Sequence, residues 1–125
     1  MKKVIFTERA PKAIGPYSQA IEKNGFLYIS GQVPIDPATG KLIEGEIKEQ
    51  TDRVMKNIGE ILKAAGYEYS DVVRCTCLLS DMANFPLMNE VYGRYFTENP
   101  PARAAFGVVK LPLGALIEIE VIAAK

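Results

Sequence analysis

The chain has 125 residues, of which 48% are hydrophobic and 24% are charged, and its 15 basic and 15 acidic side chains cancel. This length predicts a single domain over residues 1–125, and the apolar content excludes a disordered chain. The balanced charge disfavours a dedicated nucleic-acid binder and an electrostatic membrane-surface protein, because both usually carry a basic excess. It also leaves little electrostatic repulsion against self-association.

Missing residue types restrict the chemistry further. The sequence contains no histidine, which excludes Ser-His-Asp catalysis, Cys-His catalysis and His-ligated zinc. It has no apolar run of the roughly 18 residues that a membrane span needs, and its first residues lack the apolar stretch of a secretory signal. The cytosol is therefore the expected compartment.

The two cysteines, Cys75 and Cys77, lie two residues apart in a segment that reads as a strand. Strand alternation places both side chains on one face, pointing the same way, and this geometry disfavours a disulfide between them. Two thiolates alone are also too few ligands for a structural zinc site. We interpret them as two small buried residues, with a redox role as the alternative.

Periodicity, together with glycine and proline positions, predicts the elements of the first third of the chain. A short strand at residues 3–6 precedes a loop at residues 10–17 that contains two prolines and a glycine. Asn24-Gly25 supplies the positive φ of a tight turn, which predicts a hairpin between strands at residues 18–22 and 26–30.

The rest of the chain is predicted to contain two amphipathic helices and three strands. A loop rich in turn residues, 34–45, precedes a helix at residues 46–65, whose apolar residues recur at helical spacing and which Gly66 ends. The elements that follow are predicted as a strand at 71–79, a helix at 84–96 and strands at 104–109 and 115–123.

This order of elements, mixed without strict alternation, predicts an α+β domain with both helices on one face of a mixed sheet. The last strand places Ile117, Ile119 and Val121 on one face, and it places Glu118 and Glu120 on the other, beside Leu116 and Ile122. The second face is thus partly apolar, and we expect another copy of the chain to cover it in a homo-oligomer. A half-solvated sheet face is the alternative.

Arg103 is the first candidate for ligand binding. It follows Pro100-Pro101, which stiffen its approach, and its small neighbours leave room beside the guanidinium. A guanidinium fork in that setting suits two-point binding of a carboxylate. The alternatives are an ordinary surface arginine and a structural ion pair with Glu118 or Glu120.

Two further segments carry candidate site residues. The turn Ile14-Gly15-Pro16 presents Tyr17, which could equally belong to the core. Ser30-Gly31 puts a glycine at the end of a strand, where a ligand can approach the backbone closely.

Three segments, AIGPYSQAI (13–21), LYISGQVPIDPATG (27–40) and PPARAAFGVVKLPLGALIEIEVIA (100–123), resemble the Rid family of reactive intermediate deaminases, in particular its RidA branch. The resemblance extends over essentially the whole chain. It implies a chorismate-mutase-like α+β fold and a homotrimer whose sheets line a central barrel. It also implies three ligand sites in the clefts between subunits.

The activity that the resemblance implies is hydrolysis of 2-imino acids and their enamine tautomers, such as 2-aminoacrylate and 2-iminobutanoate, to 2-keto acids and ammonia. No cofactor and no metal is expected. The resemblance assigns catalytic positions to three residues: Arg103 would bind the substrate carboxylate, Glu118 would hold and activate water, and Tyr17 would lie beside the substrate. The substrate-binding residues that it implies are Ser30, Gly31, Phe85, Asn89 and Ala105, the last at a position where several RidA proteins carry cysteine.

From these assignments we expect Arg103 and Glu118 to face each other across a cleft. Two other functions remain open on the sequence. One is a non-catalytic regulatory trimer that binds a small carboxylate such as a keto acid. The other is a protein that acts on nucleic acid, which the zero net charge disfavours.

Overall fold

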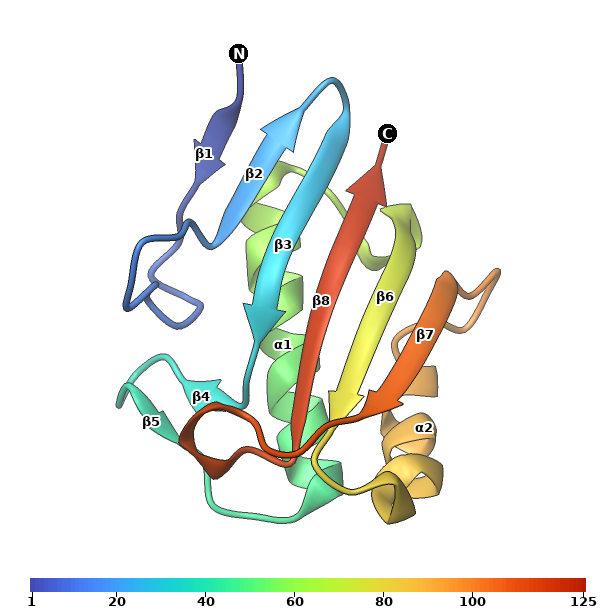
Figure 1. Ribbon diagram of the computed structural model, residues 1–125. Helices are drawn as coiled ribbons and strands as arrows, with labels where there is room; N and C mark the ends of the chain where they lie inside the picture. The colour runs from blue at the N-terminus through green and yellow to red at the C-terminus, as the bar shows by residue number, and fades with distance from the viewer.

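The computed structural model describes all 125 residues, and its centre is a six-stranded sheet of order β1-β2-β3-β8-β6-β7 (Figure 1). Strands β6 and β7 are parallel, and every other neighbouring pair is antiparallel. The strands are β1 (Lys3–Ile5), β2 (Ala20–Lys23), β3 (Phe26–Gln32), β6 (Val72–Leu79), β7 (Ala102–Gly107) and β8 (Ile117–Ala124). The hairpin turn predicted at Asn24-Gly25 is confirmed, with a positive φ at both residues.

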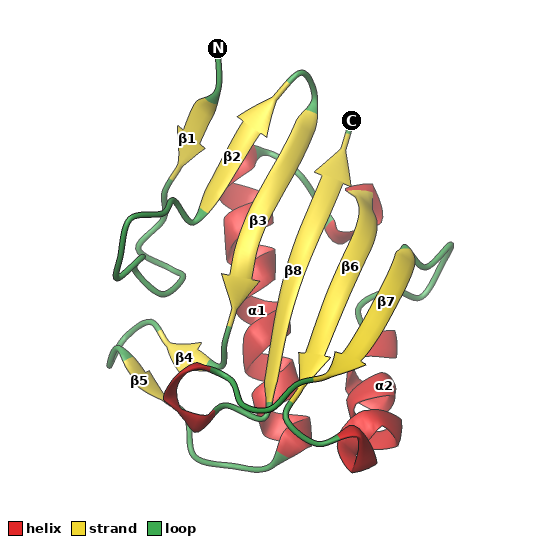
Figure 2. Ribbon diagram, viewed as in Figure 1, coloured by secondary structure: helices red, strands yellow, loops and turns green.

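Both helices, α1 (Ile47–Ala65) and α2 (Phe85–Gly93), pack on the same face of this sheet (Figure 2). Helix α1 begins with a reciprocal capping box between Glu46 and Glu49 and ends at Gly66, whose φ of 82° is the left-handed conformation that glycine tolerates. The α+β class, with two helices on one sheet face, is therefore confirmed.

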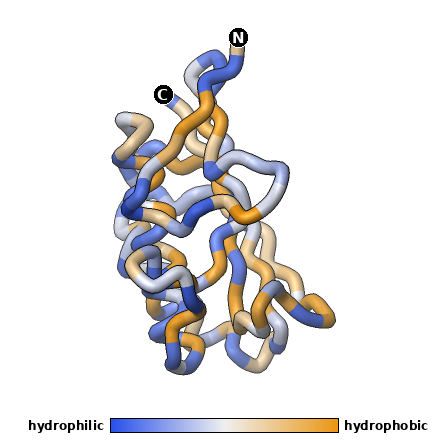
Figure 3. The backbone as a smooth tube through the Cα atoms, turned by 90° about the vertical axis from the view of Figure 1, so that its left-hand side faces the viewer, coloured by the Kyte–Doolittle hydropathy of each residue, from blue (hydrophilic) through white to orange (hydrophobic).

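The core lies between the helices and this sheet face, called here the helix face. Ile117, Ile119 and Val121 of β8 are buried there, as their alternation predicted. Cys75 and Cys77 of β6 are also fully buried, and both are free thiols. Neither α1 nor α2 combines the length and the apolar content that a membrane-spanning helix requires. Hydropathy alternates over short distances along the chain (Figure 3).

The other face of the sheet, the open face, has neither α1 nor α2 against it (Figure 2). Three large aromatic side chains remain substantially exposed on its strands: Phe26, Tyr28 and Phe106. Thr76, Leu78 and Ile122 lie between these aromatics and are half-buried. The expectation that this face is partly apolar is confirmed, and the single chain leaves that apolar surface uncovered.

Several element boundaries differ from the prediction. Helix α2 ends at Gly93 rather than at residue 96, because the next two backbone N–H groups donate to carbonyls only three residues earlier. The predicted helix includes Phe96 because this residue is apolar. In the structure Phe96 lies beyond the helix and packs in the core beside Tyr92. Strand β7 starts at Ala102, two residues earlier than predicted, because it pairs with β6 from that residue onward.

The loop predicted at residues 34–45 contains a small hairpin of β4 (Ile35–Asp36) and β5 (Lys41–Leu42), which was not predicted. Three short 3-10 turns complete the chain: η1 (Tyr69–Asp71), η2 (Met82–Asn84) and η3 (Pro112–Gly114). The last two predicted strands are not neighbours, because β6 lies between β7 and β8. This insertion determines which candidate residues share a face.

Candidate functional site

Arg103 and Glu118 lie on opposite faces of the sheet. Arg103 is paired with Cys75 across the β6–β7 ladder, so its side chain leaves the sheet on the helix face. Glu118 is paired with Leu78 across the β6–β8 ladder, so its side chain leaves on the open face. Within one chain, therefore, the two residues do not face each other, and the candidate site consists of two separate halves.

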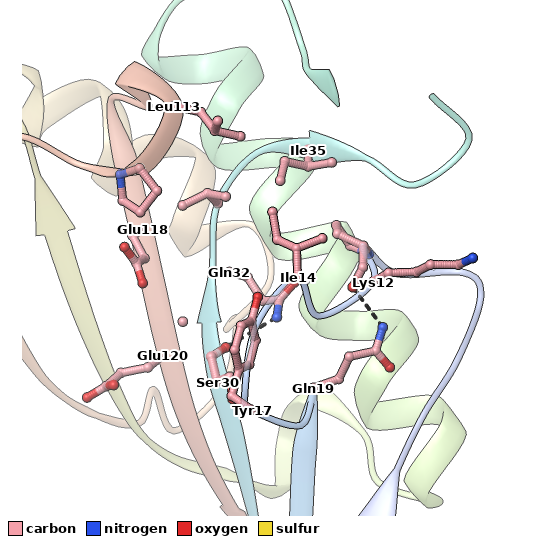
Figure 4. Close-up of a pocket in the computed structure, with 14 residues that line it drawn as sticks. Lys12, Ile14, Tyr17, Gln19, Ser30, Gln32, Ile35, Leu113, Glu118 and Glu120 are labelled. Atoms are coloured by element: carbon pink, nitrogen blue, oxygen red, sulfur yellow. Dashed lines mark hydrogen bonds between the residues drawn. The ribbon is translucent and has the colours of Figure 1, made fainter. Parts of the chain in front are cut away.

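The half on the open face is a cavity of about 590 Å³ (Figure 4). It brings together four of the predicted site residues, which come from three distant segments of the sequence: Tyr17, Ser30, Gly31 and Glu118. Glu120 lines the same cavity from the next outward position of β8. Additional lining residues that were not predicted as site residues include Lys12, Ile14, Ile35, Pro112 and Leu113.

A local irregularity in β3 positions the residues beside Glu118. The register with β8 shifts between Ile29 and Gln32, so Ser30 and Gly31 form a bulge. The Ser30 hydroxyl donates to the Ser18 carbonyl at 2.6 Å, which ties the loop that carries Tyr17 to this bulge. A Cβ on Gly31 would overlap the Glu118 carboxylate and lie 2.9 Å from its Cδ. Glycine at position 31 therefore leaves the space that the carboxylate occupies.

The loop that carries Tyr17 is held by one buried amide, that of Gln19. Its Nε2 donates to the carbonyl of Pro11 at 2.8 Å, and its Oε1 accepts from the backbone N–H of Thr7, also at 2.8 Å. Tyr17 itself is 50% exposed, so its interpretation as a core residue is wrong. Its ring lies beside the cavity that Glu118 lines (Figure 4).

The Glu118 carboxyl is electrostatically perturbed. Burial removes part of its hydration, and the neighbouring Glu120 adds negative charge; together these raise the pKa of Glu118 above its ordinary value. A carboxyl with a raised pKa holds and releases protons closer to neutral pH than ordinary glutamate does. It is therefore suited to general acid–base work.

The half on the helix face surrounds Arg103 at the edge strand β7. The Nη1 group of Arg103 donates to Oδ1 of Asn89 at 2.7 Å. Its Cζ lies 5.2 Å from the ring centre of Phe85 and 5.0 Å from that of Tyr92. Asn89, Tyr92 and Arg103 line a cavity of about 390 Å³ together with Pro100 and Pro101.

Phe85, Asn89 and Tyr92 occupy positions i, i+4 and i+7 of α2, so one face of this helix presents all three to Arg103. Phe85 and Asn89 were predicted as site residues. Tyr92 was predicted only as part of the apolar face of the helix, and its position relative to Asn89 was the available sequence signal. Ala105 leaves β7 on the same side as Arg103 and is paired with Cys77.

Arg103 forms no ion pair within the chain. The three salt bridges are Lys48–Glu90, Lys56–Asp52 and Arg94–Glu90. The alternative in which Arg103 is a structural partner of Glu118 or Glu120 is therefore wrong for the single chain. Aromatic rings and a neutral amide orient the guanidinium without neutralising it, which leaves its charge available for an anion. No cluster of three or more potential metal-ligating residues is present.

Comparisons with known proteins match nearly the whole chain. Residues 7–125 match the family model described as Endoribonuclease L-PSP. A RutC family protein of Pyrococcus horikoshii is 58% identical over 125 residues, which cover 100% of this chain and 99% of that protein. The 2-iminobutanoate/2-iminopropanoate deaminase of Mus musculus is 51% identical over 123 residues, covering 98% of this chain and 91% of that protein.

A solved structure, that of E. coli TdcF with bound serine, superimposes with a TM-score of 0.94 at 36% identity. The match covers 98% of this chain and 99% of that chain.

Proposed function

The chain belongs to the Rid family, and we propose from this premise that it is a hydrolytic deaminase of 2-imino acids. Its substrates would be 2-iminobutanoate, 2-aminoacrylate and related imine or enamine acids, and its products 2-keto acids and ammonia. Support comes from the relative with 51% identity that is named a 2-iminobutanoate/2-iminopropanoate deaminase. The cavity around Glu118 and the lack of an ion pair at Arg103 provide the chemical support.

One observation carries the proposal: each half-site contains what the other lacks. The half on the open face has a carboxyl with a raised pKa but no arginine. The half at the sheet edge has an unneutralised guanidinium but no acid. We therefore propose a homo-oligomer in which Arg103 of one copy meets Glu118 of the next, with the apolar open face buried between copies. That the oligomer is a trimer is what the resemblance to the Rid family implies.

In the proposed mechanism, Arg103 binds the substrate carboxylate and orients C2 of the iminium ion. The Glu118 carboxylate accepts a proton from water as the water oxygen bonds to C2. The same carboxyl then returns a proton to the amine of the tetrahedral adduct. The C–N bond breaks, ammonia leaves, and loss of the hydroxyl proton gives the keto group. A positioned carboxyl of this kind contributes an acceleration of about 10²–10⁴-fold.

A second function, binding of a small carboxylate without turnover, has one observation in its favour. The E. coli TdcF structure contains bound serine, an amino acid that carries a carboxylate. Arg103 would serve that function equally well, whereas the raised pKa of Glu118 would have no role in it. The description of the family model names an endoribonuclease, but the zero net charge of this chain provides no excess of cations for RNA phosphates.

The deciding experiment generates 2-iminobutanoate in place with a threonine dehydratase and follows 2-ketobutanoate with and without this protein. We expect acceleration by the wild type and its loss in Arg103→Ala, with assembly unchanged. Arg94→Ala is the matched control, because Arg94 is an exposed arginine that only pairs with Glu90 near the end of α2. A correctly assembled wild type that gives no acceleration refutes the deaminase and leaves binding without turnover.

A mixing experiment tests whether two copies form the site. Arg103→Ala and Glu118→Gln subunits are each expected to be inactive alone. Across all trimers assembled at random from an equal mixture, about one quarter of the sites would combine an intact Arg103 with an intact Glu118, so about a quarter of the wild-type activity should return. If each chain formed its own site, mixing would restore nothing.

A further inference from the structure

The residue that the structure adds to the arginine half-site is Tyr92. Its ring centre lies 5.0 Å from the Cζ of Arg103, slightly closer than that of Phe85 at 5.2 Å. Tyr92 is only 6% exposed, whereas Arg103 is exposed to solvent. A fixed, buried ring thus contacts a long charged side chain that could otherwise adopt many rotamers in water.

The fixed position of the Tyr92 ring follows from its surroundings. On one side it packs against Phe96 at 4.9 Å between ring centres, in the core beneath the sheet. Its hydroxyl is fully buried and has no hydrogen-bond partner of ordinary geometry. Burial raises the pKa of the Tyr92 hydroxyl, and the nearby Cys75 thiol raises it further, but a thiol is only a weak hydrogen-bonding group. The hydroxyl therefore contributes little to holding the ring, which is fixed mainly by packing.

Tyr92 and Asn89 restrict Arg103 in different ways. Asn89 accepts one hydrogen bond from Nη1 and thereby orients one edge of the guanidinium. The faces of Tyr92 and Phe85 attract the positive charge without occupying its remaining N–H groups. Because none of these contacts neutralises the guanidinium, it stays available for an anion while its position is limited.

We infer that Tyr92 is a positioning residue: its buried ring holds the Arg103 guanidinium so that its free N–H groups point toward the substrate carboxylate. This inference rests on the proposed function, since it deepens the role of the same half-site. The relevant property of Tyr92 is its aromatic face and not its hydroxyl. Tyr92→Phe should therefore preserve substrate binding, and Tyr92→Leu should weaken it.

The experiment measures kcat and KM for 2-iminobutanoate, and separately the affinity for the product 2-ketobutanoate by calorimetry. For Tyr92→Leu we expect KM and the product Kd to rise by about 5- to 30-fold, the range of a partly desolvated cation–π contact, with kcat within about two-fold of the wild type. For Tyr92→Phe both constants should stay within about two-fold of the wild type.

Two further variants keep the test decisive. Tyr95→Leu is the matched control, because Tyr95 is an aromatic residue just beyond α2 whose ring contacts Tyr69 rather than Arg103. It should destabilise the fold without changing KM. If Tyr92→Leu does not fold, Phe85→Leu carries the test, because Phe85 is half-buried and forms the second ring contact.

Each outcome has one meaning. If the wild type has no deaminase activity, the proposed function is refuted. The affinities for 2-ketobutanoate then test by themselves whether Tyr92 positions Arg103. An active wild type whose KM and product Kd are unchanged in Tyr92→Leu, or in Phe85→Leu if the first variant does not fold, refutes the positioning role. Equal weakening of binding by Tyr92→Phe and Tyr92→Leu also refutes it, because the hydroxyl would then be the relevant group.

Discussion

Neighbouring residues on the same strands of this sheet have different surroundings on its two faces. On the helix face, Ile119 is fully buried in the hydrophobic core, and its contribution is packing. On the open face, Glu118 lies half-buried in a cavity, and its carboxyl has a raised pKa because burial and Glu120 both disfavour its charged form. The helix face therefore stabilises the fold. On the open face the charged form of Glu118 is unfavourable, and a second copy of the chain or a ligand can offset this unfavourable electrostatic energy.

The largest effects are expected from substitutions of these two adjacent residues of β8, which should affect turnover in one case and stability in the other. Glu118→Gln should lower kcat for 2-iminobutanoate by about 10²–10⁴-fold, because the general acid–base is lost, and should leave assembly intact. Ile119→Ala should lower the free energy of unfolding by about 2–5 kcal/mol, because it opens a cavity in the core. Assays of turnover and urea denaturation on both variants check this. Similar losses of stability in the two variants would contradict the assignment of Glu118 to catalysis and of Ile119 to packing.

Gly31 in β3 and Gly59 in α1 give a second contrast, because substitution by alanine adds one methyl group beside the site in the first case and beside the core in the second. Gly31 has no positive φ, and the atoms nearest to a Cβ there would be Oε2, Cδ and Cγ of the flexible Glu118 side chain. Gly31→Ala should therefore displace the carboxylate and lower kcat by about 10²-fold, while the thermal midpoint changes little.

Gly59→Ala in α1 is the matched variant on the helix side. Its Cβ would lie 2.8 Å from Cζ of Tyr69, whose hydroxyl donates to the Met55 carbonyl at 2.7 Å. The ring cannot move without losing that hydrogen bond, so we expect a destabilisation of about 1–3 kcal/mol with kcat per folded enzyme retained. A Gly31→Ala variant that keeps its activity would show that the Glu118 carboxylate does not need its present position.

The smallest expected effect is on pH dependence. Because the pKa of Glu118 is raised in the folded chain, the folded state binds more protons than the unfolded state between the ordinary glutamate value of 4.5 and the raised value. Wild-type stability relative to Glu118→Gln should therefore fall as pH rises through this interval, and the relative stability should be constant below it. Denaturation of both proteins across this pH range measures the difference.

The repulsion between Glu118 and Glu120 also affects turnover. Activity should decrease on the acidic side as Glu118 becomes protonated. Glu120→Gln removes one of the two causes of the raised pKa, so this acidic limb should move to lower pH. An acidic limb that stays in place in Glu120→Gln would mean that burial alone perturbs Glu118.

Local sequence patterns were sufficient for most of the fold. The helical spacing over residues 46–65, the Asn24-Gly25 turn and the strict alternation in β8 each arise from interactions between near neighbours, so the sequence predicts them directly. The end of α2 was missed for the opposite reason. The apolar side chain of Phe96 packs in the core although the residue lies beyond the helix. Helical periodicity therefore does not mark the end of α2, which tertiary contacts determine.

The sequence also pointed to Arg103, Tyr17 and Gly31, because each stands beside prolines or glycines that constrain the backbone locally, whereas Glu118 was distinguished from Glu120 by the resemblance to the Rid family. It could not determine which of them meet. Insertion of β6 between β7 and β8 gives Arg103 the register of Cys75 and gives Glu118 the register of Leu78, and these registers place the two side chains on opposite faces. The order and register of strands depend on pairings between distant segments, and only the tertiary structure decides them.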